Sequence, residues 1–470
     1  MSKWFSFRFF MLILFSFFMV FITSCQTTPN ENTDVNDPII EDPQEPIITE
    51  PEETLLSLET KFPILYLNTS NLPIDSHDTY TPAMFTMKHS DESLSFDRLT
   101  GGIRLRGHST SNFDKKPYRI RFDEEIQPLG LGDGPSRVWV LLAEYVDMSM
   151  FRNYATFKIA NELLRTSFSA SSAFVEVVLN NVHQGVYLLT EQTQVGDYRV
   201  AIDKTGEDDI TMLDTGYLLE LETDPDRRNL EGLHMESWIH VPGYSRLDVD
   251  INWSNIAQYY FSPLSGFYVI KSDALSPSQI QYIQDYLVSV YDAIYVDRTQ
   301  ETIGSLIDIS SAVDMYLLEL ITDNLDYNFS SNFIYKDQAG KLVFGPPWDH
   351  DLAFGNHYQS LSTEEIHLFH LLYELSLMPW FQELVKARFN EINQKSDSLL
   401  LNVMMEIESM SALYAMEFER NHALWEHTRR DDGWHVIYSK YSSQEEALDD
   451  FTSWFTQRIE FLESYFALWS

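Results

Sequence analysis

Two aspartates, Asp349 and Asp351, stand two residues apart in the polar and aromatic segment 347–356. In an extended chain, side chains at this spacing lie on one side, and their carboxylate oxygens are the ligands that Mg²⁺ prefers. A third acid, Asp326, ends a helical pattern in a polar loop, a position suited to presenting a base. We therefore predict a metal-dependent site at these three acids. The alternative is that they only cap turns.

Six basic residues lie between positions 104 and 121, a concentration that stands out in such an acidic chain. They are Arg104, Arg106, Lys115, Lys116, Arg119 and Arg121. Because Lys and Arg neutralise phosphate oxygens, this basic patch is a candidate seat for a phosphate-bearing ligand. The alternative is a solvated strand face whose charge is balanced by Asp123, Glu124 and Glu125.

Another acid, Glu191, ends the apolar run of residues 185–190. A carboxylate there could pair with a lysine or arginine of the basic patch and hold it in position. The alternative is a solvent-exposed acid at a strand end, without a functional role.

The elements that must position these residues read as strands first and helices later. Strands are expected at 62–68, 103–109, 116–122 and 216–222, and hairpins at 174–192, with its turn at Asn180 and Asn181, and at 333–345. Helices are expected at about 149–164, 276–294 and 310–323, and over most of the chain after Thr363. Hairpins rather than βαβ units predict an α+β fold.

The composition of the chain excludes several classes of protein. The chain has 470 residues, with 71 Asp and Glu against 32 Lys and Arg, and a formal net charge of −39. Such a charge repels a polyanion, which argues against a nucleic-acid binder. With 44% hydrophobic residues the chain has ample material for a core, so global disorder is excluded. A single cysteine cannot form an intramolecular disulfide.

The N-terminus has the pattern of an export signal. Lys3 and Arg8 precede an apolar run at 9–22, which is shorter than the ~20 residues that span a bilayer. The residues before Cys25 resemble a bacterial lipobox, so we predict a lipoprotein signal peptide at 1–25 and lipidation of Cys25. Gln26 after it favours the outer membrane or cell surface. Residues 26–59 hold ten acids, no base and five prolines, and are expected to be an extended linker to a folded domain at 60–470.

Several ordered motifs resemble one family. The segments RLRGHSTSNFDKKPYRIRF, LLAEYVDMSMFRN, GVYLLTEQ, GYLLELE, NLD and NFIYKDQAGKLVFGPPWDHDLAFGN are similar to those of the CotH kinase family, spore-coat and bacterial surface proteins remotely related to protein kinases. The resemblance spans roughly residues 62–468. It implies an atypical protein-kinase-like fold, with a strand-rich lobe at about 60–222 and a helical lobe at about 223–470. It also implies phosphoryl transfer from ATP to serine or threonine of a protein.

The resemblance assigns roles to individual residues. Lys116 matches the lysine that holds ATP phosphates, and Glu191 the acid that positions it. Asp326 matches the catalytic aspartate that accepts the proton of the substrate hydroxyl. Asp349 matches the aspartate that binds Mg²⁺ or Mn²⁺, and Asp351 is a second candidate. Arg104 and Arg106 of the basic patch are expected at the ATP phosphates.

The chain departs from the family pattern around the catalytic loop. Tyr327 follows Asp326 where relatives often have glycine. At the position of the asparagine that binds a second metal ion stands Ser331, a poor Mg²⁺ ligand, and Asn332 comes one residue later. Asn332 is then the candidate ligand, or one ion site is weak.

Two other function classes stay open. One is a non-catalytic surface or adhesion module that binds protein or glycan through the aromatic residues Trp238, Trp253, Tyr259, Tyr260 and Phe261. The other is a glycosidase, which needs two carboxylates facing one cleft roughly 5–10 Å apart and no lysine aimed at them. For the kinase reading the expected partners are a protein substrate at the cell surface and a membrane reached only through the N-terminal lipid.

Overall fold

The structure is a computed structural model. It describes residues 55–107, 110–221, 238–241, 266–328, 330–357, 360–368, 370–394, 397–426 and 441–469, which fall within one compact unit, Leu55–Ser470. The predicted signal peptide, Cys25 and most of the predicted linker lie outside the described residues. So do Trp253, Tyr259, Tyr260 and Phe261, and the side chain of Trp238.

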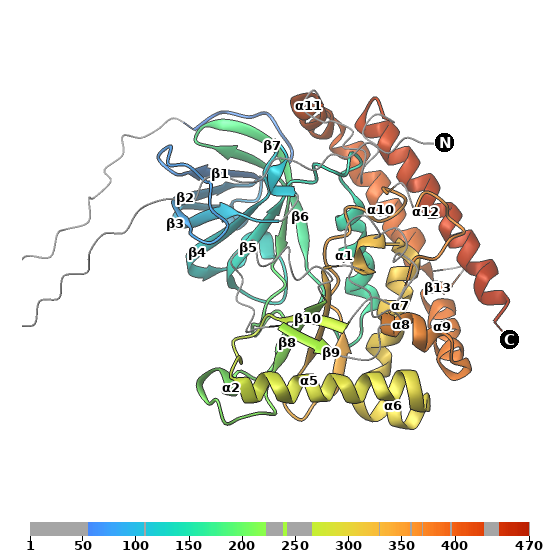
Figure 1. Ribbon diagram of the computed structural model, residues 1–470. Coiled ribbons are helices and arrows are strands. Elements are labelled where there is room, and N and C mark those ends of the chain that lie inside the picture. The colour runs from blue at the N-terminus through green and yellow to red at the C-terminus, as the bar shows by residue number, and fades with distance from the viewer. Residues whose placement is uncertain are drawn as a thin grey trace, which may run out of the picture. The chain divides into compact units, whose positions relative to one another are not determined.

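Seven strands of the N-terminal half close into a barrel (Figure 1). In barrel order they are β1 (Ile64–Asn68), β2 (Thr81–Lys88), β3 (Phe96–Leu105), β4 (Tyr118–Ile126), β5 (Ser136–Leu142), β7 (Val182–Glu191) and β6 (Ser172–Leu179). All neighbours pair antiparallel except β1 and β6, whose parallel pairing closes the barrel. The predicted strands at 62–68, 103–109 and 116–122 correspond to β1, the end of β3 and the start of β4. Apolar side chains such as Ile103, Phe122, Trp139 and Tyr187 form a core of their own.

The predicted hairpin at 174–192 is confirmed as β6 and β7. Its turn residues Asn180 and Asn181 have φ angles of 49° and 64°. Two consecutive left-handed residues match the twist of a two-residue hairpin, and asparagine tolerates this conformation better than most residues. The turn that fixes the register of this strand pair was therefore readable from two residues.

The second half is built around a buried helix and a second sheet. The sheet has the strand order β12 (Leu342–Phe344), β11 (Asn332–Lys336), β8 (Tyr217–Leu221), β10 (Gly266–Ile270) and β9 (Trp238–Val241), and all its pairs are antiparallel. The expected strand at 216–222 and hairpin at 333–345 are thus confirmed. Because β8 pairs with β11, this sheet joins segments from both sides of the predicted lobe boundary at 222, a division that stays a prediction.

Helix α1 (Arg152–Leu163) follows the barrel strand β5 and agrees with the helix expected at 149–164. It packs against α7 (Ile309–Thr322) and α10 (Leu399–Leu413) and contacts β6 (Figure 1). Both α1 and α7 bury most of their side chains. The start of α1 and the end of α7 carry residues of the candidate site described below.

Of the remaining helices, α5 (Pro277–Asp292) agrees with the helix expected at 276–294, and those after Thr363 confirm the helical C-terminal region. The other helices are α2 (Thr205–Asp208), α6 (Gln300–Leu306), α8 (His370–Ser376), α9 (Pro379–Ile392), α11 (Ala415–Trp425) and α12 (Gln444–Ala467). Short helical turns occur at η1 (Glu92–Leu94), η2 (Thr110–Asn112), η3 (Pro128–Gly130), η5 (Ala293–Asp297) and η6 (Leu325–Asn328), and β13 (Asn393–Gln394) pairs with β14 (Asp397–Ser398). The α+β class is confirmed. Among the described residues no single helix has the length and apolar character of a membrane span, although α10 and α11, bent by 76°, pass that test as a pair.

Candidate functional site

The turn between β5 and α1 is held by a buried aspartate. One carboxylate oxygen of Asp147 accepts hydrogen bonds from the backbone and hydroxyl of Ser149, at 2.9 and 2.6 Å, and the other accepts from the backbone N–H of Arg152 at 2.8 Å. The Arg152 guanidinium forms a buried ion pair with Asp147 and donates to the carbonyl of Ala353 at 3.0 Å. These contacts fix the turn against the segment that follows Asp351.

Asn153, in the first turn of α1, joins the two acid-bearing segments. Its amide nitrogen donates to the carboxylate of Glu144, at 3.2 and 3.3 Å from the two oxygens. Its amide oxygen accepts from the backbone N–H of His350 at 2.8 Å. Because His350 lies between Asp349 and Asp351, this single side chain sets the position of both aspartates relative to Glu144.

The end of α7 positions the loop of Asp326. Its last turn is followed by Asp323, which has a left-handed φ of 48° and accepts hydrogen bonds from His367 and Arg458. The next residue, Asn324, accepts from the backbone N–H of Asp326 at 3.2 Å and donates to the backbone carbonyl of Asp349 at 3.2 Å. The loops of Asp326 and Asp349 are therefore tied together, as the sequence predicted for a shared site.

The acids that converge here raise one another's proton affinity. Burial raises the pKa of Glu144 to about 8, and the charge of Asp147 adds to this rise. Burial also raises the pKa of Asp351 well above its ordinary value, with further contributions from Asp349, Glu144, Asp326 and Asp147. Carboxylates that repel each other in this way are stabilised by a cation placed among them.

A lysine shares a small buried cavity with these acids. The cavity, of about 20 Å³, is lined by Lys115, Glu144, Asp349 and Asp351, among others, and has room for roughly one water molecule. Lys115 is 1% exposed. Arg106 lines the same cavity and lies over the ring of Trp348, 5.3 Å from its centre.

Three arginines of the basic patch, Arg104, Arg119 and Arg121, lie on one face of β3 and β4. Arg104 pairs across the strands with Arg119 and lies over the ring of Tyr80. Burial lowers the pKa of Arg119, and the charges of Arg104, Arg106 and Arg121 lower it further. The arginines thus lie close enough to create a shared positive potential, as an anion site needs.

Two predicted residues lie elsewhere. The ammonium of Lys116 donates to the backbone carbonyl of Ser111 at 2.9 Å, and the neighbouring Lys115 is the lysine that lines the cavity of the acids. Glu191 forms a buried ion pair with Arg199 and accepts from the backbone N–H of Ser171 at 2.7 Å. The expected pairing of Glu191 with Lys116 is therefore replaced by one with Arg199, because the end of β7 lies beside Arg199 instead.

The two residues considered for a second metal ion, Ser331 and Asn332, lie in different surroundings. The hydroxyl of Ser331 lies 3.4 Å from a carboxylate oxygen of Asp349. Asn332, the first residue of β11, lies beside the buried Tyr327. Ser331, and not Asn332, is thus the residue that reaches the acids. Among the described residues, no three His, Cys, Asp or Glu side chains already form a group that could hold a metal ion.

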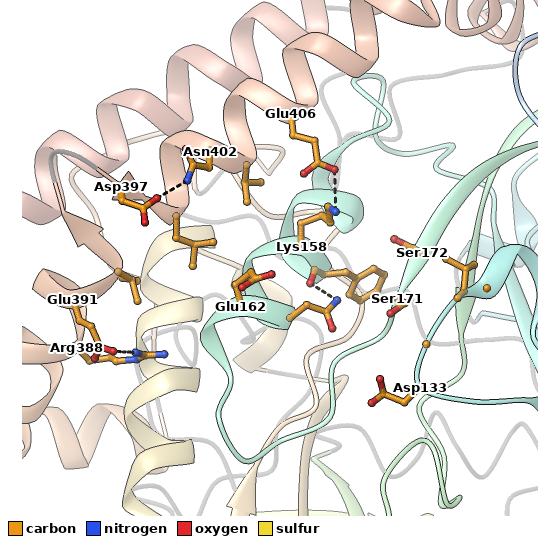
Figure 2. Close-up of a pocket in the computed structure, with 18 residues that line it drawn as sticks. Asp133, Lys158, Glu162, Ser171, Ser172, Arg388, Glu391, Asp397, Asn402 and Glu406 are labelled. Carbon is orange, nitrogen blue, oxygen red and sulfur yellow. Dashed lines mark hydrogen bonds and ion pairs between the residues drawn. The ribbon is translucent and has the colours of Figure 1, made fainter.

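A much larger cavity, of about 760 Å³, is lined by later turns of α1 and by α9 and α10 (Figure 2). Its carboxylates are Asp133, Glu162, Glu391, Asp397 and Glu406. Its two cations are engaged, Lys158 with Glu406 at 2.9 Å and Arg388 with Glu391 at 2.8 Å. This surplus of negative charge makes the larger cavity a poor site for a polyphosphate.

Sequence reasoning gave no role to four residues of the site, namely Glu144, Asp147, Asn153 and Asn324, and it named Lys115 only as a member of the basic patch. A signal existed for the first two acids. Glu144 lies two residues and Asp147 five residues beyond the end of β5, and an acid near a strand end is the pattern that drew attention to Glu191. For Lys115 no local signal separates it from Lys116, since the two are adjacent in an irregular segment.

Comparison with known proteins agrees with the motif order. A family model described as CotH kinase protein matches residues 103–462, which include the basic patch, Asp326, Asp349 and Asp351. A search of curated proteins found no match. Because the family match covers most of the sequence, the chain belongs to the CotH kinase family.

Proposed function

We propose that this chain is an exported, lipid-anchored atypical protein kinase that transfers phosphate from ATP to serine or threonine of proteins at the cell surface. Membership of the CotH kinase family implies a kinase-like function, and in general ATP and a divalent metal. The observation that carries the proposal is the shared cavity of Lys115, Glu144, Asp349 and Asp351, with Arg106 at its edge. It brings together side chains of the two kinds that phosphoryl transfer uses, cations for the phosphates and carboxylates for a divalent metal.

In this proposal the residues take the roles of a phosphoryl-transfer site. Lys115, in place of Lys116, and the arginines Arg104 and Arg106 hold the phosphates. Asp326 accepts the proton of the substrate hydroxyl. The hydroxyl oxygen bonds to the γ-phosphorus as the bond between that phosphorus and ADP breaks. Such a reaction depends mainly on positioning and charge neutralisation, so these few groups suffice.

The donor set fits a divalent cation. Asp349 and Asp351 supply hard oxygen ligands. Burial first, and then the charges of the neighbouring acids, raise the pKa of Asp351, and a bound cation would compensate that negative charge. Mg²⁺ is usually held by one or two carboxylates together with phosphate oxygens, so an incomplete protein cage is compatible with it. Bound Mg²⁺ or Mn²⁺ would neutralise charge that develops on the phosphates.

A kinase-like architecture belongs to the same proposal. The seven-stranded barrel would take the place of the strand-rich lobe, and α7 with the helices after it that of the helical lobe. In support, Lys115 comes from the barrel side, whereas Asp326, Asp349 and Asp351 come from segments after α7. The short strand β8 lies at the end of the predicted strand-rich part, and it would lead the chain from that part into the second sheet.

The location proposed for this activity is the outer membrane or cell surface. Cys25 would carry the lipid, residues 26–59 would separate it from the domain, and the membrane would be contacted through that lipid alone. The net charge of −39 supports a protein partner rather than a nucleic acid.

The alternative is a catalytically inactive CotH-like module that binds protein or glycan at the surface. It predicts no Mg²⁺-dependent ATP binding and unchanged partner binding in Asp326→Ala. A glycosidase is disfavoured by the lysine that lies in the cavity of Asp349 and Asp351.

The test is incubation of residues 26–470 with labelled ATP, Mg²⁺ or Mn²⁺, and candidate surface proteins. We expect label transfer that is lost in Asp326→Asn and in Asp349→Asn. Asp449→Asn, an exposed aspartate of α12, is the matched control and should keep full transfer. Absence of ATP binding by the unaltered protein would overturn the proposal.

A further inference from the structure

Lys115 is a buried cation with a fixed set of partners. Its ammonium donates to the backbone carbonyl of Val186 and, at 3.0 Å, to the side-chain oxygen of Asn421. It also lies 4.5 Å from the centre of the Tyr187 ring. A charge removed from water needs such partners, and together they hold the lysine where it lines the cavity of Glu144 and the aspartates.

Of these partners, Asn421 is the one that comes from outside the barrel. It lies on α11, 306 residues further along the chain than Lys115, and is 2% exposed. Its side-chain oxygen also accepts from the backbone N–H of Val186 at 3.1 Å. Its amide nitrogen lies 3.5 Å from the sulfur of Met150, in the turn that Asp147 holds. One amide thus joins the lysine, β7 and the acid-bearing turn.

The backbone of β7 leaves just enough space for this amide. Gly185 has a φ of +86°, and a Cβ added there would lie 2.4 Å from the side-chain oxygen of Asn421. Any larger residue at position 185 would therefore displace Asn421 from the ammonium of Lys115. The close approach of α11 to β7 depends on this glycine.

We infer that Asn421 is a positioning residue of the site, which fixes the ammonium of Lys115 at the acid cluster. The inference rests on the proposed function, in which Lys115 contacts the ATP phosphates. A lysine side chain that must be ordered on binding costs up to roughly 2 kcal/mol of conformational entropy. Asn421 orders it beforehand, so its loss should weaken ATP binding without removing any group that reacts.

The first readout is steady-state kinetics of Asn421→Leu, which has a similar volume and no acceptor. We expect KM for ATP to rise about tenfold, the loss of one hydrogen bond to a charged group, with kcat within about twofold of the unaltered enzyme. Asn421→Asp keeps the acceptor and should restore KM to within about threefold. Asn402→Leu, an exposed asparagine of α10, is the matched control and should change neither constant.

The second readout does not involve ATP. The rate at which a small amine-reactive reagent acylates Lys115, followed by fragmentation mass spectrometry of the peptide that contains Lys115, should rise at least about threefold in Asn421→Leu, since a hydrogen bond to a charged group is lost, and stay low in Asn421→Asp. If the leucine variant does not fold, Gly185→Ala decides instead, because its Cβ displaces the same oxygen and leaves every polar group present.

The outcomes separate the two claims. An unchanged KM and an unchanged acylation rate in a folded Asn421→Leu or Gly185→Ala protein overturn the positioning role. A faster acylation of Lys115 in a protein that binds no ATP at all overturns the proposed function and supports the positioning of the lysine by Asn421.

Discussion

Asn153 donates one amide group to both carboxylate oxygens of Glu144, at 3.2 and 3.3 Å. Its amide oxygen meanwhile accepts from the backbone of His350 at 2.8 Å. The ionisation of Glu144 is therefore coupled through one side chain to the segment that carries Asp349 and Asp351. This relationship makes Glu144 the natural place to test how the acid cluster affects stability.

The replacement Glu144→Gln should stabilise the protein at alkaline pH. Burial first, and then the charge of Asp147, raises the pKa of Glu144 from 4.5 to about 8 in the folded state. The folded state then binds more protons than the unfolded state between these values, so stability falls as pH rises through that interval. In EDTA, we expect Glu144→Gln to match the unaltered protein near pH 4.5 and to exceed it by about 3–5 kcal/mol at pH 8.

The measurement is urea unfolding at a series of pH values. Glu162→Gln, at an exposed glutamate of α1, controls for the general effect of removing a negative charge and should show no such pH-dependent gain. Equal unfolding free energies of Glu144→Gln and the unaltered protein at pH 8 would contradict the prediction.

The replacement Lys115→Met should remove phosphoryl transfer, whereas Lys116→Met should not. Lys115 shares the cavity of the acids, and Lys116 bonds to the carbonyl of Ser111. Loss of one preorganised electrostatic group commonly lowers the rate by about 10²–10³. We therefore expect kcat/KM to fall by about that factor in Lys115→Met and by less than about threefold in Lys116→Met.

Lys158→Met completes this comparison, because Lys158 lines the larger cavity and pairs with Glu406. It should retain activity if ATP binds at the acid cluster. Loss of ATP binding in Lys158→Met with retention in Lys115→Met would move the nucleotide to the larger cavity.

Local sequence patterns predicted the individual strands and helices better than they predicted how the strands close into a barrel. The turn at Asn180 and Asn181, the helix α1 and the hairpin of β11 and β12 all follow from turn residues and periodicity in one short segment. The parallel pairing of β1 with β6 does not, since it joins strands over a hundred residues apart and depends on the twist of the whole barrel. Strand content is thus local information, whereas barrel closure is not.

In the candidate site, too, some residues could be predicted from the local sequence and others could not. Asp326, Asp349 and Asp351 stood out by type and spacing, and the structure ties their loops together. The choice between Lys115 and Lys116, and the partner of Glu191, depends on which way a side chain turns after packing. Arg199 lies only eight residues beyond Glu191 in the sequence, yet nothing in the chain pattern marks it as the partner.

The replacement Ser331→Asn should increase the affinity of the site for Mg²⁺. The family resemblance assigns Ser331 to the position of a second metal ligand, and its hydroxyl lies 3.4 Å from Asp349. Its φ of 57° is left-handed, a conformation that asparagine tolerates well. An amide oxygen is a better Mg²⁺ ligand than a hydroxyl. We expect the Mg²⁺ concentration for half-maximal transfer to fall by about tenfold, the low end of the effect that residues supporting a metal ligand have on metal affinity.

Two neighbours serve as controls for this change. Ser330→Asn places the same side chain one residue earlier, and Asn332→Ala removes the asparagine that lies beside Tyr327. Neither should alter the Mg²⁺ titration. A shift in Asn332→Ala larger than that in Ser331→Asn would return the second ligand to Asn332.

The replacement His367→Gln should reduce stability at acidic pH more than at alkaline pH. Burial by itself would lower the pKa of His367, but the hydrogen bond to Asp323 at 3.0 Å and the charges of Asp323 and Glu365 outweigh it, so the pKa is raised. A raised histidine pKa gives stability that is fully present below the ordinary value of 6.5 and is lost as pH rises through the folded-state value. We expect His367→Gln to lose about 1–2 kcal/mol of unfolding free energy at pH 6 and clearly less at pH 9. His77→Gln, at an exposed histidine, should show no such difference. If the loss in His367→Gln grows with pH instead, the charged pair with Asp323 does not anchor the end of α7.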